Sequence, residues 1–245
     1  MKVIPFACLS DNYAYLLVCD KTGESVIVDP SEPEPVLRAV TAAGVTPGGI
    51  WNTHHHFDHT GGNEALASHY KLAWVSGHAS DKGRIAGQTQ FLEAGQRFKM
   101  GSLDVEILHI PGHTLGAIGY VVREPGGGTV MFTGDTMFHA GCGRLFEGTP
   151  AQMYTSLQSL VAVGADARVY PGHEYTLGNL RFAASVEPDS AAIREALAAA
   201  TAKRDRGEPT VGTTVALERE TNPFVRAKDG AALGVVRAAK DVWKG

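Results

Sequence analysis

The segment Asn52–Asn63, NTHHHFDHTGGN, holds the residues of this chain best suited to chemistry. Four histidines and one aspartate lie between His54 and His59, and two glycines follow shortly after. Protonated imidazoles at this density would repel one another, and neutral imidazoles pack less well than aliphatic side chains. A metal ion removes the difficulty, because neutral imidazole and carboxylate are common metal ligands. The segment therefore predicts a metal site.

Further candidate ligands stand where short apolar runs end. The runs SVIVD, LHIPGH, VMFTGD and VYPGH end at Asp29, His113, Asp135 and His173, and the run GGIWNT leads directly into the histidine cluster. Strands of one layered sheet that finish at one edge would bring these side chains to a single crevice, where α/β proteins commonly form their sites. We therefore expect the later histidines and Asp135 to join the cluster.

The alternation of side chains divides these ligands into two sets. In an extended segment, His54 and His56 project to one side and His55 to the other. Asp58 and His59 follow where the chain turns into a helix, and they can point to a second position nearby. The two predicted sets are His54, His56, His113 and Asp135 for one ion, and Asp58, His59, His173 and the same Asp135 for the other. Five histidines and two carboxylates without a thiolate suit Zn²⁺, and also Fe or Mn.

The other histidines gain no ligand role from this spacing, and we expect them to be structural or solvated: His55, His69, His78, His109 and His139. Asp29 is intermediate, because neither set has a ligand position left for it. We expect its carboxylate to orient one of the ligands.

The elements that would position these residues form an α/β layered domain over residues 1–172. Short β-branched runs recur there, with occasional helical patterns between them. One such helix is predicted at TPAQMYTSLQSLVAVG, with Thr149 as its N-cap and Pro150 in its first turn. From residue 173 to residue 245, alanine-rich segments with helical periodicity predict a mostly helical section, which must pack on the α/β body to bury residues such as Phe224.

Composition narrows the function classes. A net charge of −4 over 245 residues provides no global basic field, so neither nucleic acid nor an anionic membrane is an expected partner. The three cysteines, Cys8, Cys19 and Cys142, cannot all pair and form no CxxC motif, which is typical of free thiols in a reducing compartment. The N-terminus resembles neither a signal peptide nor a spanning helix. We expect a cytoplasmic protein.

The pattern THHHFDH, followed by His113, Asp135 and His173, resembles the metallo-β-lactamase superfamily. This resemblance implies an αβ/βα sandwich with a binuclear metal site at its edge. The segments VIPFACLSDNYAYLL, GCGRLFEGT, GHEYT, NLRFA and NPFVR are similar to the hydroxyacylglutathione hydrolase (glyoxalase II) family. This second resemblance covers nearly the whole chain, including the helical section over 173–245, and its metal ligands fall on the two sets given above.

The same resemblance implies a set of substrate contacts. Arg144, Tyr175 and Arg226 match residues of the family that hold glutathione, and Lys228 is a further basic candidate. Phe146 stands where many members have tyrosine, so one hydroxyl contact to glutathione is absent. Glutathione carries two carboxylates, which explains why an acidic protein would keep arginines near the mouth of its site.

The implied reaction is hydrolysis of S-lactoylglutathione to glutathione and D-lactate, a step in methylglyoxal detoxification. It would use two metal ions per chain, with Zn²⁺ expected ahead of Fe or Mn. A metal-bridging hydroxide, held by Asp58 and Asp135, would attack the thioester carbonyl while the metals stabilise the oxyanion. The thiolate is weakly basic, so it would leave without a strong general acid. A monomer is expected.

Three other functions are compatible with a chain of this type. A persulfide dioxygenase of the same fold also uses glutathione derivatives, but it holds one iron and consumes oxygen. A lactonase or β-lactamase would share the metal site without needing the segments that contact glutathione. A catalytically silent binding protein would be expected to have lost at least one ligand, whereas this chain keeps all seven.

Overall fold

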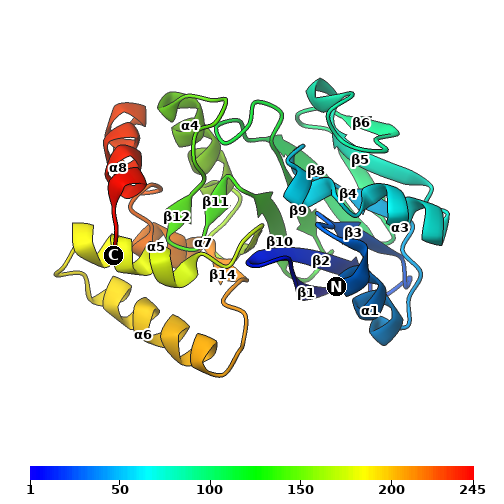
Figure 1. Cartoon of the computed structure of the whole chain (residues 1–245), viewed down its shortest axis with the longest axis horizontal. Coiled ribbons are helices and arrows are strands. Elements are labelled where there is room, and N and C mark those ends of the chain that lie inside the picture. The colour runs from blue at the N-terminus through cyan, green and yellow to red at the C-terminus, as the bar shows by residue number, and fades with distance from the viewer.

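The computed structural model describes residues 1–245, and its strands form two six-stranded sheets that face each other (Figure 1). The first sheet consists, in spatial order, of β1 (Lys2–Cys8), β2 (Asn12–Val18), β3 (Ser25–Val28), β4 (Gly49–Trp51), β5 (Trp74–His78) and β6 (Gln90–Leu92). Strands β1, β2 and β3 pair antiparallel, and β3 to β6 pair parallel. Strands β3, β4, β5 and β6 therefore all end at the same edge.

The second sheet has the order β14 (Thr213–Thr214), β13 (Arg168–Pro171), β10 (Thr129–Gly134), β9 (Ile118–Arg123), β8 (Leu103–His109) and β7 (Arg97–Met100). Strand β9 is antiparallel to both β8 and β10, and β13 is parallel to β10. Strands β8, β10 and β13 therefore run in one direction. A short hairpin of β11 (Met137–Phe138) and β12 (Gly141–Cys142) follows β10.

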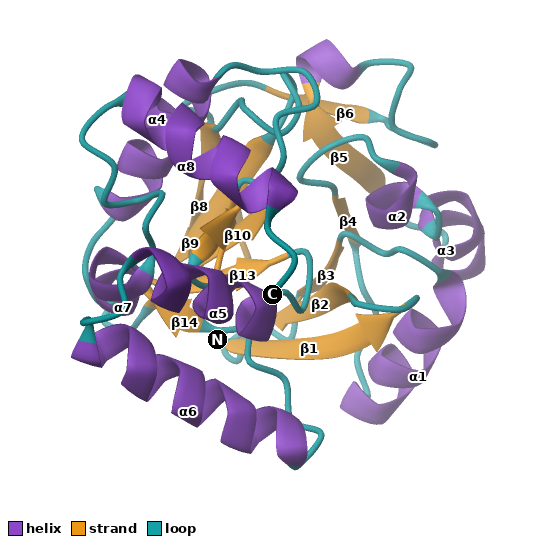
Figure 2. Cartoon of the chain, turned by 60° about the vertical axis from the view of Figure 1, so that its left-hand side comes forward, coloured by secondary structure: helices purple, strands orange, loops and turns teal.

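Helices cover the outer faces of both sheets (Figure 2). The first half of the chain contributes α1 (Pro33–Ala43), α2 (Phe57–Thr60), α3 (Asn63–Tyr70) and the 3₁₀ turn η1 (Ala79–Asp81). The second half contributes α4 (Pro150–Val161), α5 (Thr176–Val186), α6 (Ala191–Asp205), α7 (Val215–Thr221) and α8 (Gly230–Val242). The order of layers is helix, sheet, sheet, helix, so the predicted αβ/βα sandwich is confirmed.

The buried strands divide their side chains between two cores. On β2, Tyr15 and Leu17 face the second sheet and pack with residues such as Phe132, whereas Leu16 faces outward and packs with Val36 of α1. Side chains of a strand alternate between its two faces, so a strand covered on both sides has to be apolar throughout. This is why the runs in the sequence are continuous rather than alternating.

The N-terminus of α4 follows the prediction from its sequence. The Thr149 hydroxyl accepts a hydrogen bond from the Gln152 amide at 3.2 Å, and the Gln152 side chain accepts one from the Thr149 amide at 2.9 Å. This capping box satisfies two amides that have no partner within the helix. Pro150 stands in the first turn, where no amide hydrogen is needed.

The section over 173–245 is mostly helical, as predicted, but it also completes the second sheet. Strand β14 pairs with β13, and Phe224 and Leu233 pack in the same cluster as Val121 and Met131 of the sheet. The boundary at residue 172 therefore divides the α/β elements from the mostly helical ones, but residues on both sides of it share one hydrophobic core.

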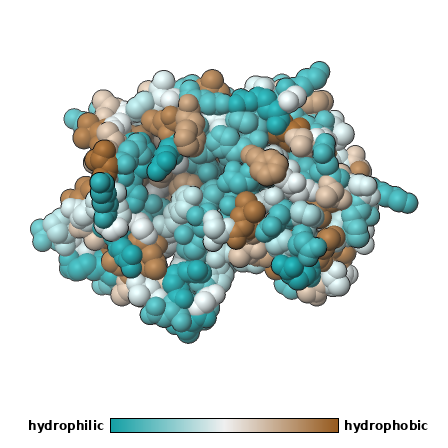
Figure 3. Space-filling view, viewed as in Figure 1, coloured by the Kyte–Doolittle hydropathy of each residue, from teal (hydrophilic) through white to brown (hydrophobic).

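None of the helices combines the length and the apolar composition that a membrane-spanning helix requires. On the face shown in Figure 3, apolar side chains form small separate groups among polar ones, as on the surface of ordinary folded domains.

Candidate metal centre

Both sheets, rather than one, bring the candidate ligands together. The histidine cluster and Asp29 follow β4 and β3 of the first sheet, whereas His113, Asp135 and His173 follow β8, β10 and β13 of the second. The prediction of one shared sheet edge was therefore wrong in its topology. The ligands meet because the two stacked sheets present their strand ends at the same end of the sandwich.

The first group consists of His54, His56 and His113, whose ligand atoms lie within 4.8 Å of one another. The His56 Nδ1 atom is 3.1 Å from Nε2 of His54 and 3.0 Å from Nε2 of His113. Asp135 borders this group, since its Oδ2 atom is 3.4 Å from Nε2 of His113.

The second group consists of Asp58, His59 and His173, again with ligand atoms within 4.8 Å. Asp58 Oδ2 lies 3.7 Å from His59 Nε2 and 3.4 Å from His173 Nε2. Asp135 also borders this group, with distances of 3.3 Å to both histidines. Asp135 thus lies between the two groups and faces both.

Three of the five candidate ligand histidines, His59, His113 and His173, are held in place through their Nδ1 atoms. The Nδ1 atom of His113 hydrogen-bonds the Arg144 carbonyl at 2.9 Å, that of His173 lies 2.9 Å from an oxygen of Asp11, and that of His59 lies 3.1 Å from Asp29. Such partners fix the orientation of each ring and leave the lone pair of Nε2 free for a metal ion.

Asp29 supports the ligand segment in two ways. Its carboxylate accepts hydrogen bonds from the Thr53 amide at 2.8 Å and the Thr53 hydroxyl at 2.6 Å, and it faces His59. Asp29 has a φ of 48°, a strained conformation for a residue other than glycine. The carboxylate thereby fixes the start of the histidine segment as well as one ring within it.

The pKa values of the candidate ligands are shifted in different directions in the two groups. Burial, reinforced by the neighbouring His113 and His55, lowers the pKa of His56 to about 4, so this imidazole is neutral. Burial acts in the same direction on His173, but the charge and hydrogen bond of Asp135 raise its pKa to about 10. Burial would also raise the pKa of Asp58, yet the hydrogen bond from His173 and the charge of His59 hold it well below its usual range.

The residues fit a metal ion in their chemistry as well as their positions. His59 Nε2 and Asp135 Oδ1 are buried without a hydrogen-bond partner, which is costly unless a further group satisfies them. Gly172 leaves room beside this pair, because a Cβ at this position would lie 2.5 Å from Cε1 of His59 and 2.6 Å from Oδ1 of Asp135.

The remaining histidines lie outside both groups. His55 faces away from its neighbours, with Nδ1 3.6 Å from an oxygen of Asp81. His78 and His109 stack on each other with centroids 4.6 Å apart, His139 is buried near Glu218, and His69 is exposed on α3.

A cavity of about 480 Å³ opens beside the metal ligands, with His113 and Asp135 among its lining residues. Of the predicted substrate contacts, Arg144, Phe146 and Tyr175 line it. Phe146 packs edge-on against His113, with ring centroids 5.2 Å apart. Tyr175 stacks on His173 at 4.7 Å.

Two further basic residues in the cavity, Arg237 and Lys240 of α8, were missed in the sequence. The Arg237 guanidinium donates to the Cys142 carbonyl at 2.8 Å and pairs with Asp241 at 3.0 Å. The Lys240 ammonium donates to the Gly178 carbonyl at 3.0 Å, and burial followed by the charge of Arg237 lowers its pKa to about 8. A signal existed in the sequence, since both residues continue the helical stripe that begins at Leu233.

Arg226 and Lys228, the other predicted contacts, do not line this cavity. The Arg226 guanidinium pairs with Glu187 at 2.5 Å and donates to the Glu220 carbonyl at 3.3 Å. The carbonyl of Lys228 accepts a hydrogen bond from the Tyr154 hydroxyl at 3.2 Å. The turn after α7 therefore directs Arg226 toward the end of α5, away from the metal ligands.

Comparison with known proteins agrees with this architecture. Residues 10–173 match the metallo-beta-lactamase superfamily, and residues 174–243 match the hydroxyacylglutathione hydrolase C-terminus. The two-sheet sandwich with His and Asp clusters at its edge thus defines a metallohydrolase of the metallo-β-lactamase type. Within that superfamily, the chain belongs to the hydroxyacylglutathione hydrolase family.

Similar relatives cover nearly the whole chain. The hydroxyacylglutathione hydrolase of a Synechococcus species is 46% identical over 244 residues, which are 98% of this chain and 94% of the relative. That of Thermosynechococcus vestitus is 45% identical over 93% of this chain and 89% of its own length. Because 98% of this chain is aligned with the Synechococcus relative, that alignment includes the helical section.

Solved structures agree on the fold. ETHE1 from Myxococcus xanthus has a TM-score of 0.74 at 25% identity, over 100% of this chain and 93% of its own. TTHA1623, solved in a di-iron-bound form, has a TM-score of 0.61 at 27% identity, over 91% of this chain and 100% of its own.

Proposed function

We propose that this protein hydrolyses S-(2-hydroxyacyl)glutathione thioesters, converting S-lactoylglutathione to glutathione and D-lactate in methylglyoxal detoxification. The observation that carries the proposal is that the His and Asp clusters open directly into a cavity lined by Arg144, Arg237 and Lys240. A metal centre beside three cationic side chains suits a substrate with a reactive carbonyl at one end and carboxylates at the other. The names of the relatives support the same substrate class.

The centre holds two metal ions in this proposal, one in each group. His54, His56, His113 and Asp135 bind the first ion, and Asp58, His59, His173 and Asp135 bind the second. Nitrogen and oxygen donors without thiolate favour Zn²⁺, with Fe or Mn as alternatives. Ions at such a site make hydroxide available at neutral pH and polarise a bound carbonyl oxygen.

The residues around the metal ligands orient the reactants. Asp58 and Asp135 accept hydrogen bonds from water at the centre and so aim its lone pair at the thioester carbonyl. Asn12 holds Asp58 in place, since its amide donates to the Asp58 carboxylate at 3.0 Å. The departing thiolate is a weak base compared with an amine and can take its proton from water after the carbon–sulfur bond breaks, so the chain needs no strong general acid at this point.

The glutathione half lies in the cavity. Its two carboxylates pair with the buried Arg237 and the half-buried Lys240, and with Arg144 at the rim. Charge-assisted hydrogen bonds of this kind are worth about 1.5–3 kcal/mol each when desolvated. Phe146 and Tyr175 contact the peptide between its ends. Arg226 and Lys228 take no part.

The wider setting follows from the same proposal. Residues 173–245 act as the substrate-binding section, because α5 and α8 supply one wall of the cavity. All three cysteines are free and buried, which suits a reducing compartment such as the cytoplasm. We propose that the monomer is the active unit, since the cavity and all seven metal ligands come from one chain.

The test follows thioester cleavage of S-lactoylglutathione by the purified protein alongside elemental analysis of bound metal. We expect hydrolysis that stops on strong chelation and about two ions per chain. Oxygen uptake with glutathione persulfide serves as the control for a dioxygenase, and we expect none. One ion per chain together with oxygen uptake would replace the hydrolase with the dioxygenase.

A further inference from the structure

The loop between β12 and α4, residues 143–148, belongs to the cavity and to the metal centre at once. It carries Arg144 and Phe146, which line the cavity. Its backbone is bonded to the segment around His113: the amide of Phe146 donates to the His113 carbonyl at 3.2 Å, and the His113 ring bonds the Arg144 carbonyl at 2.9 Å. A shift of this loop must therefore move a metal ligand.

Glu147 of the same loop adds a side-chain connection. One of its carboxylate oxygens accepts a hydrogen bond from the Leu115 amide at 2.8 Å, two residues after His113. Its other oxygen pairs with the Arg84 guanidinium. The carboxylate thus joins the turn behind one metal ligand to a residue of the opposite sheet's edge.

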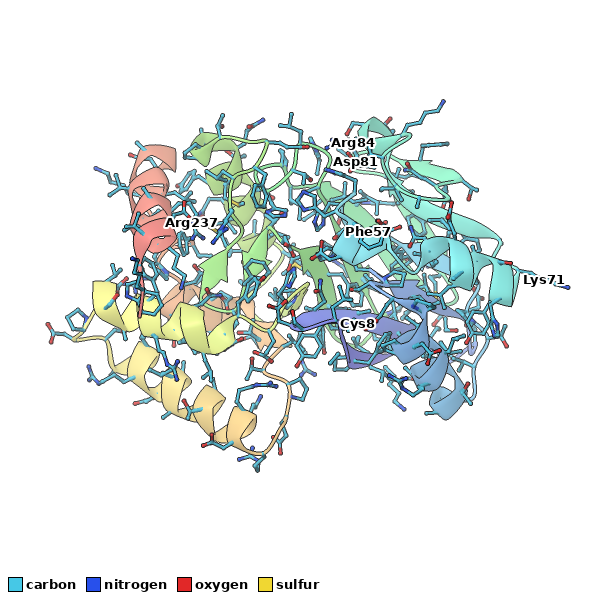
Figure 4. All side chains as sticks on the ribbon, in the orientation of Figure 1. Cys8, Phe57, Lys71, Asp81, Arg84 and Arg237 are labelled. Carbon is cyan, nitrogen blue, oxygen red and sulfur yellow. The ribbon has the colours of Figure 1, made fainter.

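Arg84 continues the connection to the histidine cluster. Its guanidinium lies 3.3 Å from an oxygen of Asp81 and 2.6 Å from Nε2 of His55. Asp81 is fully buried. Its carboxylate lies directly against Gly116 in the turn after His113, where an added Cβ would be 2.3 Å from it. Figure 4 shows Asp81 and Arg84 together at the upper edge of the site, on the side opposite Arg237.

An ordinary surface ion pair would not connect these segments. Glu106 offers the comparison: it accepts hydrogen bonds from Arg97 at 2.8 Å and Arg123 at 2.7 Å, but all three residues lie on neighbouring strands of one sheet. Pairs of that kind contribute little to stability. The Glu147 network instead joins four separate segments, and two of them carry metal ligands.

We propose that Glu147 is a positioning residue that couples the cavity proposed to bind glutathione to the metal centre. Through Leu115 it holds the turn of His113, and through Arg84 it holds His55, the neighbour of His54 and His56. This inference rests on the proposed function for the identity of the cavity's ligand. A ligand that fixes Arg144 and Phe146 also fixes this loop, so its binding strengthens metal retention, and metal strengthens ligand binding by the same factor.

The experiment measures how fast the metal-loaded full-length protein loses metal to a chelator, with and without S-hexylglutathione. This probe carries the peptide of glutathione but has no free thiol that could bind metal. Glu147→Ala removes both connections, whereas Glu147→Gln keeps an acceptor for the Leu115 amide and loses the charge pair. Glu106→Ala and Glu106→Gln are the matched controls.

For the wild type we expect slower metal loss when the probe is bound. Glu147→Ala should lose metal about tenfold faster without the probe and gain little protection from it, since partners of metal ligands typically affect metal affinity by that factor. Glu147→Gln should fall between the two. Its kcat for S-lactoylglutathione should drop more than its KM rises, whereas both Glu106 variants should behave as wild type.

The proposal is overturned if Glu147→Ala matches the Glu106 variants in metal loss, in protection and in the ratio of kcat to KM. Circular dichroism of Glu147→Gln identifies unfolding, and this milder variant decides the matter if the alanine variant unfolds. Failure of the proposed function is seen separately, as a wild type that neither cleaves the thioester nor responds to the probe. Metal loss without probe still compares the variants in that case.

Discussion

At the residue scale, the two cations of α8 differ in their surroundings. Arg237 is 8% exposed, but it hydrogen-bonds a carbonyl and pairs with Asp241. Lys240 packs over the rings of Phe182 and Trp243, and burial followed by the charge of Arg237 lowers its pKa to about 8. Lys240 therefore titrates within the pH range of an ordinary assay.

Lys240 should make substrate binding dependent on pH. As pH rises through about 8 the ammonium loses its proton, so KM for S-lactoylglutathione should rise about tenfold while kcat changes little. Lys240→Arg should flatten this rise, because a guanidinium keeps its charge. The measurement is KM between pH 6.5 and 9.5 for both proteins, a range chosen to be about one and a half units either side of the lysine pKa.

Arg226→Ala provides the control for this prediction. It removes a cation that pairs with Glu187 outside the cavity, so its KM profile should follow the wild type.

The pH dependence of stability provides an independent test of Lys240. The pKa of Lys240 is lower in the folded chain than in the unfolded one, so the unfolded state binds more protons above about pH 8. The wild type should gain thermal stability with rising pH relative to Lys240→Met, and the absence of that gain would contradict the assignment.

Metal content tests the central carboxylate. Asp135 faces both groups of ligands, at 3.3 Å from His59 and 3.4 Å from His113. Asp135→Ala should therefore reduce the content from about two ions per chain toward none, because each ion loses a ligand. His55→Gln should retain most of the metal, since His55 points toward Asp81. Elemental analysis after gel filtration gives both numbers, and equal losses in the two variants would mean that the ligand sets are wrong.

At the element scale, the position of α8 depends on close backbone contact with α4. A Cβ at Gly230 would lie 2.6 Å from Cα of Ala151, which is backbone and cannot move aside without shifting a helix. Gly230→Ala should therefore displace α8 and its two cations. We expect KM for glutathione thioesters to rise about tenfold or more with metal content unchanged, because small displacements of binding groups are costly.

Ala238→Val is the matched control on the same helix, since Ala238 is exposed. It should leave KM as it is. Turnover of a small neutral thioester should be unaffected in either variant, because such a substrate does not use the cations of α8. A Gly230→Ala protein with wild-type KM would show that the spacing between α4 and α8 is not needed for binding.

Most residues of the candidate metal centre could be predicted from the sequence to lie together, whereas only part of the cavity could be predicted. His54, His56, Asp58 and His59 are close in sequence, so alternation and a helix start suffice to place them. His113 and His173 could be expected because each ends an apolar run. Periodicity does not show which sheet a strand joins. For this reason the sequence could not predict that the site lies across two sheets.

The basic side of the cavity was harder to predict, because it depends on which face of α8 meets the sandwich. Arg226 lies in the recognisable segment NPFVR, yet the turn there directs it to Glu187. Arg237 and Lys240 continue the buried stripe of an amphipathic helix. From the sequence alone, cations at such positions are assigned to the surface, because the elements packed against them are not known. The short strand β14 was missed for a similar reason, since two residues carry no period.

At the scale of the whole molecule, the helical section and the α/β section share one core. Phe182, Val215, Phe224 and Leu233 are buried in the cluster on the outer face of the second sheet. Burying one such side chain is worth about 1.5–3 kcal/mol. Losing all four would cost about as much as the entire 5–15 kcal/mol that stabilises a typical domain.

A fragment of residues 1–172 should consequently fail to fold, although it retains six of the seven metal ligands. Its second sheet would lose β14 at one edge and expose Val121 and Met131 on its outer face. The control is a fragment of residues 1–229, which lacks only α8 and keeps three of the four buried side chains. We expect this longer fragment to unfold cooperatively at a lower temperature than the full chain, to bind metal, and to hydrolyse S-lactoylglutathione with a much higher KM. Thermal unfolding followed by circular dichroism separates the cases: a cooperative transition in the 1–172 fragment would mean that the two sections are independent domains after all.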